Sequence, residues 1–513
     1  MADFTDVDAT VEHESVWLAT SELPVYQTLD SNIDVDVAVV GGGLVGLTTA
    51  LLAQRDGARV AVLEADRIGA GTTGYTTGKV TSQHSTIYAD LIQRHGEADA
   101  RRYADANQAG VEQIATLVSQ LGIECDLTRA PAYAYTRRPD QRDQIDAEAH
   151  AAAMLGLPAK LTHDIDLPFD IEAAVRFENQ LHLHPGRYLA GIAAAVANAG
   201  GLIFDRTRVR DIDEQHGRAA ELTASGHTIR ANQVVVATLL PLGIIGGYFA
   251  RSRPVRSYGL AVQLKSAAPT TMAISVDSLT RSTRPWPTAG PNGLIVAGNG
   301  HETGAEPDSE GRYADLERWC RSTFDVESVD YRWSSQDYST PDRIPYVGRS
   351  PLSSHVFVAT GFQKWGFSNG TAAAMILTDA LAGRDNAWLP AFDARRIGDA
   401  HAVGELVKDN LKVGKEFVAG RLARTGAAPA AALEPGEGGL ADLDGTTVGA
   451  YRDRNGGLHA VRPTCTHLGC PLRWNPAETS WDCNCHGSRF DPDGSILNGP
   501  AVEPLEQIPP PQR

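Results

Sequence analysis

The sequence predicts an α/β (α+β) fold, in which a large domain built around a parallel sheet precedes a small all-β domain. Near the N-terminus a β-branched run, a glycine-rich loop and a helix-forming segment follow one another over residues 33–55, as in a βαβ unit. Residues 424–439 are rich in Ala, Pro and Gly, which is typical of a linker. After them, short strand-like runs alternate with turn residues, and four of the six cysteines fall within residues 465–485.

Length and charge limit the classes of protein to which the chain can belong. Its 513 residues predict about three compact units. The hydrophobic content of 42% is enough to build real cores. A formal net charge of −17 argues against a nucleic-acid partner, because a polyanion needs a basic face. Six cysteines are too few for a disulfide scaffold of this length.

We expect neither an export signal nor a transmembrane segment. Residues 1–30 lack the basic and apolar regions of a secretory signal. The longest apolar run, 234–250, contains Pro241 and three glycines, so we interpret it as a buried strand followed by a loop and not as a bilayer span. The sequence therefore predicts a cytoplasmic protein.

The elements of the large domain follow from apolar runs and from the glycines that stop them. An irregular leader (1–32) is expected before a buried strand (33–40). A helix (44–55) and a second strand (59–63) come next. The remaining elements are expected as helices at about 88–121, 188–199 and 371–382, and strands at 202–204, 234–237 and 356–359; residues 255–335 alternate strand-like runs with turns, and the small domain has strands at 446–451 and 458–461.

The loop after the first strand has the pattern G-x-G-x-x-G, formed by Gly41, Gly43 and Gly46. The first glycine permits a tight turn, the second lets the backbone approach a pyrophosphate, and the third lets helix and strand pack closely. The helix N-terminus offers N–H donors to phosphates. Glu64 ends the second strand, 21 positions after Gly43, where a carboxylate can accept a ribose hydroxyl. The pattern predicts a Rossmann-type dinucleotide-binding domain but does not by itself separate FAD from NAD.

Further motifs resemble one superfamily and favour FAD over NAD. Residues 66–73 (DRIGAGTT) run into GKV at 78–80, and HPGRYL (184–189), TRV (207–209), TPDRIPYVG (340–348) and GFQKWGF (361–367) follow in order. Over about residues 33–385 the chain resembles the D-amino-acid-oxidase superfamily, the group of glycine and sarcosine oxidases. The resemblance implies FAD bound by Gly41, Gly43, Gly46, Glu64, Thr72, Thr73, Lys79, Val209, Gly361, Trp365 and Gly366. Because the 361–367 loop has neither Cys nor His, we expect FAD to be non-covalent.

The same resemblance points to three residues for the chemistry. Lys364 lies in the second flavin loop, where an amine can stabilise reduced flavin or a superoxide-like anion; a solvated surface lysine is an equal alternative. Arg343 and Tyr346 are candidates for the substrate pocket, since an arginine can hold a carboxylate with two hydrogen bonds. An arginine in a surface ion pair is the alternative. His182 and His184 lie inside or next to a superfamily motif, so a structural or flavin-proximal role is favoured over metal binding.

The cysteine cluster contains the pattern C-x-H-x15-C-x-x-H, formed by Cys465, His467, Cys483 and His486. Four such ligands also suit tetrahedral zinc. The segments CTHLGC (465–470) and CNCHGS (483–488) resemble the loops of a Rieske [2Fe–2S] domain, in which two thiolates hold one iron and two imidazoles hold the other. The resemblance covers about 430–513. It implies Cys465, His467, Cys483 and His486 as ligands and a disulfide between Cys470 and Cys485, as in respiratory Rieske proteins.

Two positions near the ligands bear on the redox potential. Ser488 can donate a hydrogen bond to a cluster sulfur and raise the potential. High-potential Rieske proteins usually have a tyrosine at the position of Phe490, so we expect a potential below the top of the Rieske range. The remaining cysteines, Cys125 and Cys320, are isolated in the sequence and are expected to be inert core residues.

These resemblances imply a division of the chain. A leader (1–32) is followed by a D-amino-acid-oxidase-type domain (33–385), a helical extension and linker (386–428) and a Rieske domain (429–513). Within the second unit, the FAD part is expected at about 33–85, 180–250 and 340–385, and the substrate part at about 86–179 and 251–339.

The favoured function is oxidation of a small amine or amino-acid-like substrate at FAD, with electrons passed to the Rieske cluster. The alternative is an FAD/Rieske electron-transfer component that supplies a partner oxygenase or another redox protein, and a redox sensor is a third possibility. There is no second dinucleotide motif for NADH and no D-x-x-H-x4-H segment for a mononuclear iron. The expected partners are a small-molecule substrate and an electron-accepting or electron-donating protein or quinone.

Overall fold

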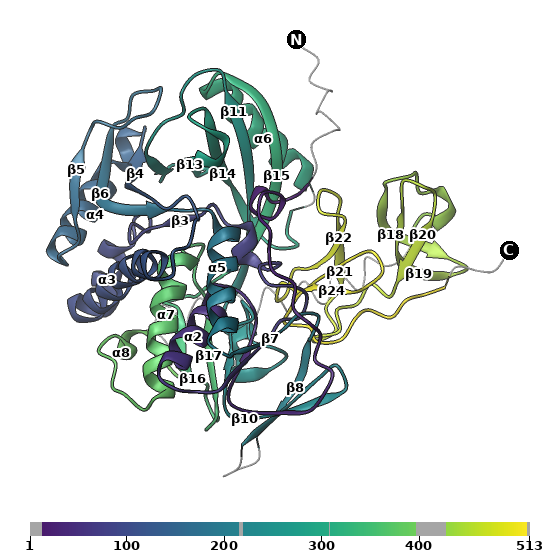
Figure 1. Cartoon of the computed structure of the whole chain (residues 1–513). Helices are drawn as coiled ribbons and strands as arrows, with labels where there is room; N and C mark the ends of the chain where they lie inside the picture. Colours follow the sequence, from purple (N-terminus) through teal and green to yellow (C-terminus); the bar gives the residue numbers. More distant parts are fainter. Residues whose placement is uncertain (1–12, 215–218, 307, 397–426, 510–513) are drawn as a thin grey trace.

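The computed structural model describes residues 13–214, 219–306, 308–396 and 427–509. The described part forms a large body with two extended sheets and packed helices, and the small C-terminal domain lies against one side of that body (Figure 1). The predicted fold class is confirmed, because an α/β domain with a second sheet subdomain is followed by an all-β domain.

The first sheet carries the dinucleotide motif. Its strands, in spatial order, are β16 (Tyr346–Arg349), β17 (Val356–Thr360), β10 (His227–Val236), β1 (Ile33–Val40), β2 (Val60–Leu63) and β7 (Leu202–Phe204), with β9 (Ala220–Ala224) and β8 (Val209–Asp213) added beside β10. Strand β1 pairs in parallel with β10 and β2. Alternate side chains enter two cores: Val37 and Val39 face the helices, and Ala38 and Val40 face the β8–β9 hairpin.

Helices α2 (Leu44–Arg55), α5 (Pro185–Asn198) and α7 (Gly366–Leu381) pack on the first sheet, and α3 (Tyr88–Leu121) packs mainly on α7. Helix α2 follows the glycine loop directly, as the sequence predicts. Helix α7 begins at Gly366, five residues before the predicted start at Thr371. The extra turn places the helix N-terminus inside the second flavin loop, where its free N–H groups can meet a ligand.

The second sheet forms the substrate side. Its strands, in spatial order, are β15 (Val326–Ser339), β11 (Arg253–Leu264), β14 (Gly293–Glu302), β13 (Arg281–Pro285), β12 (Met272–Ser275), β4 (Thr128–Thr136), β6 (Ala173–His182) and β3 (Lys79–Val80), with β5 (Ala159–Thr162) beside β6 and helix α4 (Arg142–Met154) packed on it. Strand β3 is the end of the first flavin loop (66–80), and β15 ends just before the 340–348 motif. Both outer strands therefore connect the substrate sheet directly to predicted nucleotide loops.

Two parts of the body depart from the sequence prediction. Helix α6 (Ser309–Thr323) interrupts the region that was expected to hold only strands and turns. Its buried residues Tyr313, Leu316 and Cys320 recur at helical spacing, and Asp308 caps it by accepting the Gly311 N–H at 2.8 Å. The strand-like runs on either side obscure this signal in the sequence.

The leader is not simply irregular. Within it, the short helix α1 (Val16–Ala19) buries Val16 and Trp17. The Trp17 indole donates to the Thr76 carbonyl at 2.6 Å, so the leader packs on the first flavin loop. Of the predicted extension 386–428, residues 386–396 include the short helix α8 (Leu389–Phe392), and 397–426 lie outside the described residues.

The C-terminal domain has two small antiparallel sheets. They are formed by β18 (Gly438–Leu443), β19 (Thr446–Arg452) and β20 (Leu458–Val461), and by β21 (Leu472–Asn475), β22 (Ser480–Cys483), β23 (Arg489–Phe490) and β24 (Ile496–Asn498). The cysteine loops follow β20 and β22. Across the described ranges, we find no helix that combines the length and the apolar character needed to cross a membrane.

Candidate functional site

The glycine loop between β1 and α2 has the geometry that a dinucleotide cradle needs. Gly41 has φ +111°, and a Cβ there would lie 2.6 Å from the Ala237 carbonyl oxygen. A Cβ on Gly46 would overlap the Gly41 carbonyl oxygen, so helix and loop can pack this closely only with glycine. A Cβ on Gly43 would meet only the Thr73 hydroxyl, at 3.2 Å. This middle glycine is therefore the open one, where a pyrophosphate can approach the backbone.

Glu64 lies at the end of β2, beside the glycine loop. Its carboxylate accepts the Gly42 N–H at 2.6 Å and the Asp66 N–H at 2.9 Å. Burial raises its pKa, although both N–H groups lower it. Each carboxylate oxygen keeps a further lone pair, which a ribose hydroxyl can use. Val209, predicted on the adenine side, is buried at the start of β8.

The first flavin loop joins three parts of the molecule. The Thr73 hydroxyl accepts the Leu44 N–H at the start of α2, at 3.2 Å, and the Thr72 hydroxyl donates to the Gln336 carbonyl on β15 at 2.8 Å. The Lys79 amine donates to the Ala273 carbonyl at 2.8 Å and to a β13 serine hydroxyl. Burial, with the nearby Arg284 charge, lowers the pKa of Lys79 to about 7. Lys79 is thus held by the substrate sheet.

The second flavin loop enters α7. Gly361 has φ +83°, and a Cβ there would overlap the side chain of Thr340. Gly366 is the first residue of α7, and the Trp365 ring before it stacks on His84 at 4.9 Å between centroids. Lys364 is exposed, yet desolvation lowers the pKa of its amine. The role of Lys364 beside the flavin stays a prediction.

A buried polar network that the sequence did not predict supports this loop. His84 Nδ1 lies 2.7 Å from the Tyr103 hydroxyl, and His84 Nε2 lies 2.8 Å from the Thr81 carbonyl oxygen and 2.9 Å from the Ser368 hydroxyl. Burial lowers the pKa of His84 to about 3, so its ring is neutral. Both of its ring nitrogens are hydrogen-bonded. Nothing in the local sequence signals these long-range partners.

The residues present fit FAD. The glycine loop leaves room at Gly43, the N-termini of α2 and α7 supply free N–H groups, and the two loops carry the predicted contact residues. When bound, FAD supplies hydride acceptance, which no side chain offers. The residues of the glycine loop and the two flavin loops would bind and orient it.

The two candidate substrate residues are held by partners. Arg343 Nη1 lies 3.1 Å from the Asp90 carboxylate, so it forms the ion pair that was the alternative to a substrate clamp. Tyr346 is buried on β16, with the guanidinium of Arg396 at 4.1 Å and that of Arg251 at 4.4 Å from its ring centroid. Arg343 Nη1 also donates to the Thr86 carbonyl at 3.4 Å. Their role in the substrate pocket stays a prediction.

His182 at the end of β6 and His184 just after it have structural contacts. His184 caps α5 by accepting the Arg187 N–H at 3.3 Å, and its Nε2 lies 2.9 Å from the Thr20 hydroxyl. His182 Nδ1 lies 3.1 Å from the Arg284 guanidinium. These contacts agree with the structural role favoured by the sequence.

The four predicted cluster ligands lie together at the tips of two loops. Interactions with Cys483 and Ser488 lower the pKa of the Cys465 thiol to about 7. The His467 and His486 rings are 5.1 Å apart. His467 Nδ1 is buried and has no hydrogen-bond partner in the described part of the chain. A buried, unpartnered imidazole nitrogen at a predicted ligand position fits iron ligation.

The predicted disulfide between Cys470 and Cys485 is present, with Cα atoms 6.5 Å apart. It crosslinks the two cluster loops. The sulfurs of Cys470, Cys483 and Cys485 also lie within 4.8 Å of one another, but two of them share the disulfide and cannot act as thiolate ligands. The isolated Cys125 and Cys320 are buried, and burial raises the pKa of each to about 12, which agrees with inert thiols.

The histidine side of the cluster site faces the large body. His467 Nε2 lies 3.0 Å from the Gly243 carbonyl oxygen in the loop after β10. The Phe249 ring contacts both His467 and His486 edge-on, at 5.0 Å between centroids. On the neighbouring side, the Tyr338 hydroxyl donates to the His486 carbonyl at 2.9 Å.

The chain therefore combines a dinucleotide cradle and two flavin loops with a site of two cysteines and two histidines. Together these features define a flavoprotein oxidoreductase joined to a Rieske domain. The chain belongs to the FAD dependent oxidoreductase family, whose model matches residues 36–380, and a Rieske [2Fe-2S] domain matches residues 425–509. It is an FAD-dependent oxidoreductase whose cofactors are FAD and a [2Fe–2S] cluster.

Relatives cover both parts. The chain is 35% identical over 500 residues to YhfW of Bacillus subtilis, which carries the name of a Rieske 2Fe-2S iron-sulfur protein, with 96% of this chain and 97% of the relative covered. It is 25% identical over 398 residues to gamma-glutamylputrescine oxidoreductase of Escherichia coli (72% of this chain, 90% of the relative). The fold resembles glycine oxidase from Geobacillus kaustophilus with a TM-score of 0.61 and 20% identity, covering 71% of this chain and all of that one.

Proposed function

We propose that the protein oxidises a small amine or amino-acid-like substrate, with FAD as the first acceptor, and passes the electrons to its own Rieske cluster. The substrate class is supported by the glycine oxidase fold and by the relative that is named for gamma-glutamylputrescine. Oxidation of a CH–NH group to C=N releases two electrons, and a [2Fe–2S] cluster takes up one at a time, so each substrate requires two transfers and a further acceptor. That acceptor is a protein or a quinone.

The observation that carries the proposal is the end of strand β15, which contacts both cofactor sites. On one side, the Tyr338 carbonyl accepts the Gln363 N–H of the second flavin loop at 3.0 Å, and the Asp337 carboxylate accepts the Lys364 N–H at 2.5 Å. On the other side, the Tyr338 hydroxyl reaches the His486 carbonyl and the Gln336 amide donates to the Gly487 carbonyl at 2.8 Å. Three consecutive residues thus join the flavin loop to the cluster loop.

The alternating directions of a strand explain this bridge. Gln336 and Tyr338 share one face of β15 and point to the Rieske domain, whereas Asp337 points to the flavin loop. Burial raises the pKa of Asp337 to about 6, against the two N–H groups that it accepts and the Lys364 charge. Asp337 therefore fixes the loop backbone at Lys364.

Anaerobic mixing with candidate amines, amino acids and NAD(P)H tests the proposal. Flavin reduction is followed by its absorbance, and cluster reduction by electron paramagnetic resonance. We expect an amine or amino acid to bleach the flavin and then to produce the reduced-cluster signal. In a Cys483→Ser variant without the cluster, the same substrate should bleach the flavin alone. Reduction only by NAD(P)H or by a protein donor would overturn the proposal in favour of an electron-transfer component.

A further inference from the structure

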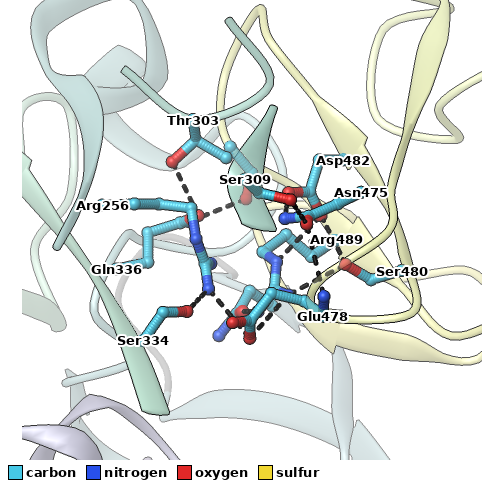
Figure 2. Close-up of polar contacts among 12 residues, drawn as sticks. Arg256, Thr303, Ser309, Ser334, Gln336, Asn475, Glu478, Ser480, Asp482 and Arg489 are labelled. Carbon is cyan, nitrogen blue, oxygen red and sulfur yellow. Dashed lines mark hydrogen bonds and ion pairs between the residues drawn. The ribbon is translucent and has the colours of Figure 1, made fainter. Parts of the chain in front are cut away.

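The junction between the two domains contains a buried group of charged side chains (Figure 2). Arg256 extends from β11 of the substrate sheet, and Glu478 lies in the turn between β21 and β22 of the Rieske domain. The Arg256 guanidinium and the Glu478 carboxylate are 3.2 Å apart, and their side chains are only 1% and 16% exposed. At this burial an ion pair is screened little by water.

Glu478 is held from both domains. Its Oε1 accepts the Tyr313 hydroxyl of α6 at 2.8 Å, and its Oε2 lies between Arg256 and Arg489, with Arg489 at 3.7 Å. Arg489 also pairs with Asp482 at 2.9 Å inside the Rieske domain. Burial raises the pKa of Glu478, but the two arginines outweigh it and hold the pKa below its ordinary value. The charges of the two arginines and the two carboxylates therefore balance in this buried part of the junction.

Among the described residues, Glu478 is the carboxylate that lies within ion-pair distance of Arg256. The Arg256 Nη2 also donates to the Ser334 hydroxyl, whereas its Nε and Nη1 are buried with no hydrogen-bond partner among the residues that the structure describes. Without Glu478, the guanidinium would be an uncompensated buried charge, which is strongly unfavourable. Next to this pair, the two domains also make contacts between neutral groups. For example, the Ser309 hydroxyl donates to the Asn475 amide oxygen at 2.7 Å.

We propose that the Arg256–Glu478 pair locks the Rieske domain in one position on the substrate sheet, and that both are positioning residues for electron transfer between the FAD site and the cluster. Glu478 lies five residues before the predicted ligand Cys483, and β22 connects them. The pair therefore fixes one end of the strand that carries the cluster loop. The electron-transfer part of this inference rests on the proposed function, whereas the docking part does not.

Hydrogen exchange tests the docking directly. The Gly243 N–H donates to the Pro500 carbonyl across the domain junction at 2.9 Å. Gly243 and Pro500 lie 235 and 22 positions from Glu478 in the sequence. Peptides that contain Gly243 should exchange about tenfold faster in Glu478→Gln, because loss of one partner of a buried pair weakens an interface strongly. Peptides of β1, inside the large body, should not change, which separates loosened docking from general unfolding.

Matched variants sharpen the test. Glu503→Gln removes an interdomain ion pair with Arg210 whose side chains are 55% and 58% exposed, and it should change exchange at Gly243 by less than about threefold. The double variant Arg256→Met/Glu478→Gln removes both charges and should exchange more slowly than Glu478→Gln alone, because no buried charge is left unpaired. Equal exchange in the wild type and Glu478→Gln would overturn the lock.

The electron-transfer part has its own measurement. The flavin is photoreduced anaerobically with a sacrificial donor, and the appearance of the reduced cluster is timed by rapid freezing. We expect Glu478→Gln to slow this step about tenfold, with unchanged flavin photoreduction and an unchanged cluster spectrum. If the wild type itself transfers no electron, the proposed function fails. If the variant loosens docking but transfers at the wild-type rate, the positioning role fails.

Discussion

Removal of the Cys470–Cys485 disulfide should lower the free energy of unfolding of the Rieske domain. The expected loss follows from the length of the loop that the disulfide closes. We choose Cys470→Ala/Cys485→Ala, because both residues are buried and alanine adds no polar group. The bridge spans a sequence separation of 15, for which loop-closure entropy gives about 3 kcal/mol. With a urea m-value of about 1.5 kcal/mol/M for a domain of this size, the unfolding midpoint of the Rieske domain should fall by about 2 M.

The assay follows the visible absorbance of the cluster during urea unfolding, since the cluster is lost when its two loops separate. Cys125→Ala is the matched control, because it removes a buried thiol from the large body and should leave the cluster midpoint unchanged. A shift of less than about 0.3 M in the double variant, with full iron content, would show that the bridge does not hold the loops together.

The other predictions concern binding, potential and pH. Gly46→Ala should abolish FAD binding, seen as loss of flavin absorbance in the purified protein with cluster content retained, because its methyl group would overlap the Gly41 carbonyl. Phe490→Tyr should raise the cluster midpoint by about 40 mV in a redox titration, since one hydrogen bond of about 1 kcal/mol would favour the reduced form; an unchanged midpoint would rule out that explanation of the lower potential. His459→Gln should lower the free energy of unfolding by about 1 kcal/mol at pH 5.5 and leave it unchanged at pH 8.5. Two aspartates raise the pKa of His459, so their stabilisation is complete below its unfolded pKa and is lost as the pH rises through the folded pKa; an equal effect at both pH values would contradict this.

Local signals in the sequence predicted the parts of the sites that are continuous in the chain. The strand, glycine loop and helix over 33–55 follow from β-branched residues and from glycines that only a tight turn and close packing require. The cluster loops and their disulfide follow from the resemblance of CTHLGC and CNCHGS to Rieske loops. In each case, the determining residues lie in short continuous segments of the sequence.

Contacts between distant segments were not predictable in this way. Asp90 neutralises Arg343 from 253 positions away, so the motif located the arginine without revealing its partner. The bridge at Gln336 and Tyr338 and the Arg256–Glu478 pair depend on how the domains dock, which no local pattern encodes. Helix α6 is a different case, because its helical spacing is present in the sequence but lies between strand-like runs.

Substoichiometric reduction tests whether electrons from the flavin reach the cluster of the same chain, as we propose. Less than one electron equivalent per chain is added anaerobically, and both cofactors are observed at equilibrium. Imidazole ligation raises the potential of a Rieske cluster above that of all-cysteine clusters, so we expect the reduced-cluster signal to appear while the flavin stays oxidised. Bleaching of the flavin with the cluster still oxidised would contradict it.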